Sequence, residues 1–217
     1  MLIIPQLFAE VFGVTSENGT KQTTLFSVKE SESLTAQLSP DRPVLIVSST
    51  SWTADEDFDK MLDAVAMLDE KIGQQVGKTN RFEFIVTGKG EMRAHYEEKM
   101  RQMKLKHCHI RTAWLSAENY PKLLASCDLG VCLHYSSSGV DLPMKVVDMF
   151  GSELPVCAVQ FRALSELVKH EQNGLIFSTA QDLANQIFVR LTVIAQILTF
   201  PSTYLKIFQQ NKKNCMQ

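Results

Sequence analysis

Short apolar segments alternate with amphipathic segments along most of this chain, and this alternation restricts the possible folds more than any other feature. The apolar segments are Val44–Val47, Phe82–Val86, His109–Ala113, Leu129–Leu133 and Val156–Val159. After the first of them, Phe58, Met61, Leu62, Val65 and Leu68 recur at helical spacing. Strands that are apolar nearly throughout, with amphipathic helices between them, are typical of a parallel sheet covered on both faces. The sequence therefore predicts an α/β fold, a Rossmann-like parallel sheet with helices on both faces.

Composition divides the chain into three parts. Residues 1–40 predict a partly disordered N-terminal extension or linker, because Thr15 to Pro40 is rich in Ser, Thr, Glu and Lys. Residues 41–190 form the predicted Rossmann-like domain, and residues 191–217 a divergent helical tail. Ile187 to Phe200 is apolar but is interrupted by Arg190 and Gln196, so we expect a packed helix there and no membrane anchor in this chain.

Charge and cysteine content exclude some function classes. The net charge is −2, and no basic stripe with interleaved aromatic residues is present, which argues against nucleic-acid binding. The five cysteines form no CxxC pair and no zinc-ligand spacing. We therefore expect no metal site of this kind, and a reducing compartment is the simple interpretation.

The run from Ser136 to Phe150 is the strongest indication of a binding site. A loop of small residues follows an apolar strand, Pro143 stands at the start of the next helix, and Lys145 lies in its first turn. Such a strand–loop–helix segment offers unpaired N–H groups and the positive end of a helix dipole to an anion. Asp148 lies three residues after Lys145, on nearly the same helix face. We expect this segment to bind a diphosphate followed by a sugar diol.

Ligands of such sheets bind beyond the carboxyl ends of the strands, so the other loops there are also candidates. Thr87-Gly88-Lys89-Gly90 begins like a dinucleotide fingerprint, but Met92 and Arg93 stand near the place of its third glycine. A tight strand-to-helix turn is the alternative to a nicotinamide site. The acids at residues 55–57 suit the dipole of the helix that follows them.

Four further residues near strand or helix ends each have two interpretations. His134 is either a ligand residue or a histidine at the edge of the core. Glu166 either belongs to the site or complements the dipole of its own helix. Trp52 and Trp114 both follow strands, and each either stacks on a base or sugar or packs against a neighbouring helix.

These segments resemble the donor-binding half of GT-B glycosyltransferases, in particular the dolichol-pathway beta-mannosyltransferases. The pattern Pro143-x-Lys145-x-x-Asp148-Met149, followed by Pro155-Val156, carries the resemblance, although these enzymes usually have a glutamate at the position of Asp148. The similarity runs from about Thr23 to Arg190 and includes the segments Val47–Thr53, Thr87–Gly90, Asp128–His134, Leu154–Val159 and Glu166–Leu175.

The resemblance implies a protein of two Rossmann-like halves, of which this chain contains the C-terminal, donor-binding one. It implies transfer of mannose from GDP-mannose to dolichol-linked chitobiose, with inversion, at the cytosolic face of the endoplasmic reticulum membrane. Other dolichol-pathway mannosyltransferases are the implied protein partners. We expect no cofactor and no metal, a catalytic base in the absent half, and a cytosolic location for this chain alone. A non-catalytic relative that binds sugar nucleotide or regulates partners is the alternative, as is a different GT-B sugar transferase.

The resemblance also assigns roles to individual residues. The backbone of Gly139–Leu142 and Lys145 would hold the diphosphate, and Asp148 would bind the ribose hydroxyls. Thr87–Gly90 and Ala113–Leu115 would line the nucleotide, with Glu166 and His134 near the diphosphate or sugar. The predicted donor-binding residues are Ser137, Ser138, Gly139, Asp141, Leu142, Lys145, Asp148, Thr87, Gly88, Gly90, Trp114, His134 and Glu166.

Overall fold

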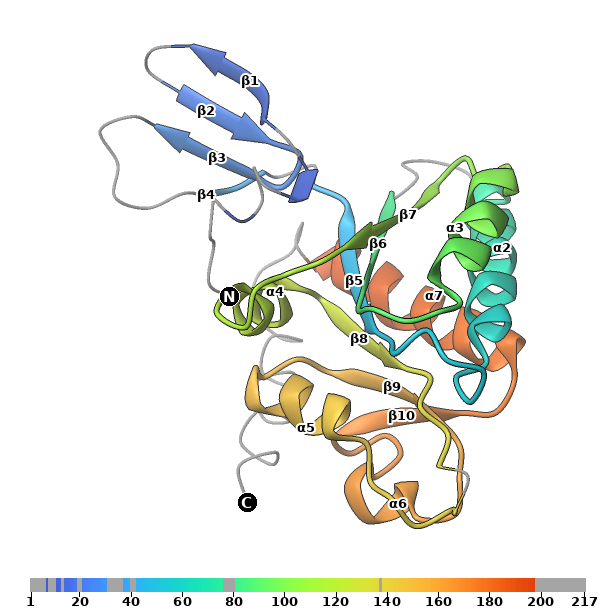
Figure 1. Cartoon of the computed structure of the whole chain (residues 1–217). Coiled ribbons are helices and arrows are strands. Elements are labelled where there is room, and N and C mark those ends of the chain that lie inside the picture. Colours follow the sequence, from blue (N-terminus) through green and yellow to red (C-terminus); the bar gives the residue numbers. More distant parts are fainter. Residues whose placement is uncertain are drawn as a thin grey trace.

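The main structural unit is a six-stranded parallel sheet (Figure 1). The computed structural model describes residues 7, 11–12, 14–18, 21–30, 37–39, 42–75, 81–136 and 138–197. The strand order is β10-β9-β8-β5-β6-β7, and all neighbouring strands are parallel. The predicted fold class is therefore confirmed. The strands are β5 (Val44–Ser49), β6 (Phe82–Thr87), β7 (Cys108–Ala113), β8 (Leu129–Cys132), β9 (Val156–Val159) and β10 (Gly174–Phe177).

Helices cover both faces of this sheet. Alternate side chains of β5 enter two separate apolar clusters, with Ile46 in one and Leu45 in the other. The first cluster includes residues of α2 and α7, and the second includes residues of α4 and α5. None of the helices in the described part of the chain is long and apolar enough to cross a membrane. The helices are α2 (Phe58–Gly73), α3 (Arg93–Gln102), α4 (Asn119–Ser126), α5 (Met144–Gly151), α6 (Leu164–Leu167) and α7 (Ala180–Ile197).

The order of the strands places a switch point between β5 and β8. From β5 the chain adds β6 and then β7 on one side, and it then returns to add β8 on the other side of β5. The loops that follow β5 and β8 therefore diverge at the carboxyl edge of the sheet, which is where open α/β sheets bind ligands. The first leads into α2 and the second into α5.

Before β5, the chain contains a small antiparallel sheet that the sequence analysis did not predict. Its strands are β1 (Val14–Asn18), β2 (Lys21–Thr24), β3 (Ser27–Glu30) and β4 (Gln37–Leu38). The prediction for residues 1–40 was a partly disordered extension or linker, and it included no strands. Pairing between mostly polar strands leaves little apolar periodicity, which is the signal that sequence interpretation uses. Phe26, between β2 and β3, is fully buried in the cluster that contains Leu45.

The predicted domain boundary at residue 190 lies within a helix. It falls inside α7, which continues without a break to Ile197. Residues 198–217, the remainder of the predicted tail, lie outside the described residues.

A buried ion pair fixes the beginning of β5 to the beginning of β8. Arg42 donates two hydrogen bonds of 2.7 Å to Asp128, and the side chains are 7% and 9% exposed. Asp128 also accepts a hydrogen bond from the backbone N–H of Leu45 at 2.8 Å. This interaction holds together the two strands between which the switch point lies.

A substitution at Asp128 tests this contribution. Asp128→Ala leaves the guanidinium of Arg42 buried without its partner, so we expect the free energy of unfolding to fall by about 3–5 kcal/mol. Urea denaturation followed by circular dichroism measures the change. Asp59→Ala is the matched control, because it removes an exposed ion pair with Lys99 and should change stability little. Equal effects of the two substitutions would contradict the role of the buried pair.

Asp69 of α2 fixes the start of β7 in a similar way. Its carboxylate accepts hydrogen bonds from the backbone N–H groups of Lys106, His107 and Cys108, the shortest of them 2.7 Å to His107. Burial pushes the pKa of Asp69 upward, but these backbone hydrogen bonds outweigh it, and the pKa lies below its ordinary value of 3.8. The folded state therefore favours the ionised carboxylate.

The lowered pKa predicts how Asp69 contributes to stability at different pH values. The contribution is complete above pH 3.8, the ordinary value, and is lost as the pH falls toward the lower pKa of the folded state. We expect Asp69→Asn to be less stable than the wild type at neutral pH, with a smaller difference in acid. Unfolding free energies measured across this range check the prediction, and a difference that stays constant with pH would contradict it.

Candidate functional site

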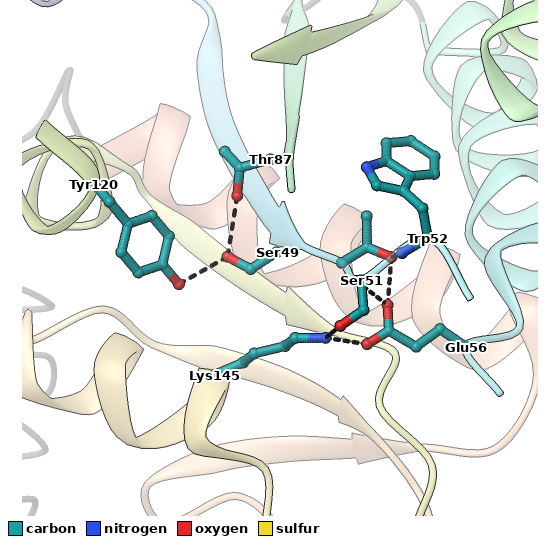
Figure 2. Close-up of polar contacts among 8 residues, drawn as sticks. Ser49, Ser51, Trp52, Glu56, Thr87, Tyr120 and Lys145 are labelled. Atoms are coloured by element: carbon teal, nitrogen blue, oxygen red, sulfur yellow. Dashed lines mark hydrogen bonds and ion pairs between the residues drawn. The ribbon is translucent and has the colours of Figure 1, made fainter. Parts of the chain in front are cut away.

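The loops after β5, β6 and β8 meet at the carboxyl edge of the sheet. Figure 2 shows Ser49 and Ser51 near the end of β5, with Thr87 of β6, Tyr120 of α4 and Lys145 of α5 around them. Thr87 donates to Ser49 Oγ at 3.3 Å, and a hydrogen bond of 2.9 Å joins Ser49 Oγ to the hydroxyl of Tyr120. Elements that are far apart in the sequence are therefore connected here by side-chain hydrogen bonds.

The two glycines after β6 allow the loop after β5 to approach closely. Gly88 has a φ of +132°, and a Cβ atom there would lie 1.8 Å from the carbonyl oxygen of Thr50. A Cβ atom at Gly90 would lie 1.9 Å from the carbonyl oxygen of Ser51. These contacts explain both glycines as parts of a tight strand-to-helix turn, the alternative that the sequence left open. Contact of Thr87, Gly88 and Gly90 with a nucleotide stays a prediction.

The two tryptophans have different environments. Trp52 is 1% exposed, with its ring centroid 4.8 Å from that of Phe58 and 6.1 Å from that of Tyr96. It packs in the core, and the alternative of stacking on a ligand is excluded for it. Trp114 is 56% exposed and lies at the end of β7, with the Nζ atom of Lys89 3.8 Å from its ring centroid. Its ring is therefore accessible beside the glycine turn.

The loop between β8 and α5 is closed by its own serines. Ser136 Oγ accepts hydrogen bonds from the N–H groups of Gly139 (3.0 Å) and Asp141 (3.2 Å), and Ser138 Oγ accepts one from Val140 (3.3 Å). The expectation of unpaired amides was therefore wrong for these three groups in this structure. Serine hydroxyls compete for nearby backbone groups, and the sequence pattern does not show which partner an amide takes. Ser138 donates to Asp141 at 2.8 Å, and Leu142 is exposed.

Helix α5 begins beside this loop without a side-chain cap. Pro143 occupies the N-cap position, and no side chain there accepts a hydrogen bond. The first amides of a helix have no partner within the helix, so those of Met144 and Lys145 are available to an anion. Ser137, another predicted contact residue, lies outside the described residues.

Lys145 points toward the loop after β5. Its ammonium forms an ion pair with Glu56 and lies 3.1 Å from the hydroxyl oxygen of Ser51 (Figure 2). The side chain of Glu56 is 2% exposed, and it also accepts hydrogen bonds from the N–H of Ser51 (2.8 Å) and the hydroxyl of Thr50. The sequence analysis assigned Glu56 only to the helix dipole. No local pattern indicates this pair, because its two residues are 89 positions apart.

Asp148 lies one turn after Lys145 on α5 and is exposed. Burial raises the pKa of the Tyr120 hydroxyl, and the negative charge of Asp148 raises it further. Tyr120 belongs to α4, which packs against α5 at this edge of the sheet. Sequence reasoning did not identify Tyr120, because a tyrosine in an amphipathic helix carries no distinctive signal.

His134 and Glu166 flank the loop on either side. The backbone of His134 forms a bridge with that of Glu56, and its half-buried ring meets Phe161 edge-on, with ring centroids 6.5 Å apart. Glu166 is exposed on α6, and the N–H of Ala163, just before this helix, donates to the carbonyl oxygen of Gly139 at 3.2 Å. The structure thus brings both elements to the loop, but the ligand contacts of the two side chains stay predictions.

A cavity of about 250 Å³ lies near the start of α2 and the carboxyl ends of β8 and β9. None of its lining residues belongs to the predicted donor site. The lining is Ala54, Asp55, Asp57, Lys60, Leu133, Tyr135 and Val159.

Solved structures share this fold at low sequence identity. The structure of Anabaena HepE in complex with UDP and glucose superposes with a TM-score of 0.59 at 18% identity, over 80% of this chain and 43% of that one. The C-terminal domain of the glycosyl transferase group 1 protein LpcC from Francisella tularensis superposes with a TM-score of 0.56 at 15% identity, over 80% and 84%. At these identities, the likeness shows the fold alone.

Curated relatives are much more similar in sequence. The human chitobiosyldiphosphodolichol beta-mannosyltransferase is 48% identical over 82% of this chain, and the UDP-glycosyltransferase TURAN of Arabidopsis thaliana is 47% identical over 80%. The chain spans 37% and 39% of the length of these two proteins. The human putative glycosyltransferase ALG1L2 is 42% identical over 88% of this chain, which spans 78% of that protein. The family described as "Glycosyl transferases group 1" matches residues 42–192, and the chain belongs to this family.

Proposed function

We propose that this chain binds GDP-mannose and is the donor-binding part of an enzyme that transfers mannose to dolichol-linked chitobiose. The observation that carries the proposal is the position of Lys145, in the uncapped first turn of α5 at the switch point of the sheet. The 48% identity with the human chitobiosyldiphosphodolichol beta-mannosyltransferase supports the choice of reaction. By the same similarity, we place the reaction at the cytosolic face of the endoplasmic reticulum membrane, with other dolichol-pathway mannosyltransferases as partners.

The diphosphate of the donor would lie between Lys145 and the first turn of α5. The ammonium and the uncapped amides stabilise the negative charge that grows on the diphosphate as GDP leaves. The proposal therefore requires neither a metal ion nor a cofactor for this step. For the amides of Gly139 and Asp141 to contact phosphate, they must exchange the hydroxyl oxygen of Ser136 for phosphate oxygens.

The remaining parts of the donor would extend along the same edge of the sheet. Asp148 would accept hydrogen bonds from the ribose hydroxyls, and the exposed ring of Trp114 offers a stacking surface to the base. His134 and Glu166 would lie toward the diphosphate or the mannose. The base that deprotonates the acceptor hydroxyl would belong to a part of the enzyme that this chain does not contain.

A second candidate function is binding of a sugar nucleotide without transfer. This chain matches the human putative glycosyltransferase ALG1L2 over 78% of the length of that protein. One assay distinguishes the two functions: it measures the transfer of mannose from GDP-mannose to a chitobiose lipid by this chain. Transfer supports the first function, whereas GDP binding without transfer supports the second.

Lys145→Ala tests the diphosphate contact. A hydrogen bond to a charged group contributes about 1.5–3 kcal/mol, so we expect the affinity for GDP to fall about tenfold or more. Isothermal titration calorimetry measures it, with Lys104→Ala as a control that removes an exposed lysine from the loop before β7. If GDP binds equally well to Lys145→Ala and the wild type, Lys145 does not belong to the site.

Asp148→Asn tests the ribose contact. We expect this substitution to weaken the binding of GDP more than that of a deoxyribose analogue, because the analogue lacks one of the hydroxyls that Asp148 would bind. Calorimetric titrations of the wild type and of Asp148→Asn with GDP and with the deoxyribose analogue give the comparison. An equal loss of affinity for the two ligands would contradict a ribose contact and point to a general effect on the site.

A further inference from the structure

Glu56 is a buried carboxylate whose charge is balanced within the site by Lys145. Its side chain is 2% exposed, while that of Lys145 is 22% exposed. A buried carboxylate is strongly destabilising unless a counter-charge and hydrogen bonds compensate it. Movement of Lys145 away from Glu56 would leave such a carboxylate without its counter-charge, so the lysine is held at this position.

Glu56 itself is fixed by the loop after β5. One carboxylate oxygen accepts hydrogen bonds from the N–H of Ser51, at 2.8 Å, and from the hydroxyl of Thr50. The backbone of Glu56 donates to the carbonyl oxygen of Thr53 at 3.1 Å and accepts from the N–H of Phe58 at 2.7 Å. The carboxylate therefore cannot follow the lysine, and it determines where the ammonium lies.

The ammonium of Lys145 keeps one donor for a ligand. A lysine has three N–H donors, and among the described residues two acceptors lie within reach of it, the carboxylate of Glu56 and the hydroxyl oxygen of Ser51 at 3.1 Å. We propose that Glu56 is a positioning residue: it holds Lys145 against the loop after β5, so that the remaining N–H contacts the diphosphate of the donor. This inference rests on the proposed function and adds that the diphosphate binds beside Ser51.

The proposal predicts the opposite of what net charge alone predicts. Removal of a negative charge near an anion site should strengthen anion binding if only the Coulomb interaction changes. Removal of a positioning carboxylate should weaken binding, because the ammonium is then no longer held in place. The sign of the change in affinity therefore separates the two explanations.

The test is a double-mutant cycle with Glu56→Gln and Lys145→Ala, in which GDP, UDP and inorganic pyrophosphate are titrated into each protein. We expect Glu56→Gln to lower the affinity for GDP about fivefold or more, and to have no further effect when Lys145 is already alanine. Asp55→Asn is the matched control. It removes one charge from the neighbouring residue, whose pKa is lowered mainly by a hydrogen bond from Thr53 and also by the charge of Lys145. It should leave the affinity unchanged or slightly higher.

Each outcome bears on the proposal. If Glu56→Gln binds GDP as tightly as the wild type or more tightly, the proposal is overturned. It is also overturned if Glu56→Gln lowers the affinity for GDP by the same factor in the wild type and in Lys145→Ala. If Glu56→Gln does not fold, Ser51→Ala takes its place in the cycle, because it removes only the second contact of the ammonium, and a loss of affinity that depends on Lys145 is again expected.

The choice of ligands separates this inference from the proposed function. If the wild type binds UDP rather than GDP, the choice of GDP-mannose fails, and the cycle with UDP still tests Glu56. If it binds no diphosphate at all, both proposals fall. If GDP binds to the wild type and to Glu56→Gln with equal affinity, only the inference about Glu56 is overturned.

Discussion

The ion pair between Glu56 and Lys145 connects the two segments that diverge at the switch point of the sheet. Glu56 lies between β5 and α2, whereas Lys145 lies in the first turn of α5, after β8. A buried carboxylate needs its counter-charge, so this pair fixes the position of Lys145, whose side chain reaches from α5 toward the loop after β5 (Figure 2). The glycines at positions 88 and 90 support the arrangement, because they let the β6 loop lie against the backbone of Thr50 and Ser51.

Much of the fold was predictable because its core follows simple periodic patterns. All six residues of β5 and all six of β6 are buried, and apolar runs of this kind identify central strands of a parallel sheet. The antiparallel strands β1–β4 were missed, since strands composed largely of polar residues carry no such run. The expected boundary at residue 190 followed the limits of a family resemblance, and a helix need not end where a resemblance ends.

The candidate site was predictable to a smaller extent. The loop, Lys145 and Asp148 could be found, because a small-residue loop before a helix is a local pattern. The hydrogen-bond partners of individual groups could not be predicted. Ser136 and Ser138 accept hydrogen bonds from amides that were expected to be unpaired, and Glu56 is 89 residues from Lys145. Long-range pairs of this kind depend on the three-dimensional arrangement of loops, and no spacing in a single sequence indicates them.

The donor site that we propose therefore has a cation already held in place and a loop whose amides are hydrogen-bonded to serines. When a diphosphate binds, it would become an additional hydrogen-bond partner of the ammonium of Lys145. The loop amides would exchange the serine hydroxyl oxygens for phosphate oxygens. A crystal structure of this chain with GDP tests this account most directly. We predict that a phosphate oxygen lies within hydrogen-bonding distance of Lys145 Nζ while Lys145 remains paired with Glu56. A diphosphate bound elsewhere, for example in the cavity beside Lys60, would contradict it.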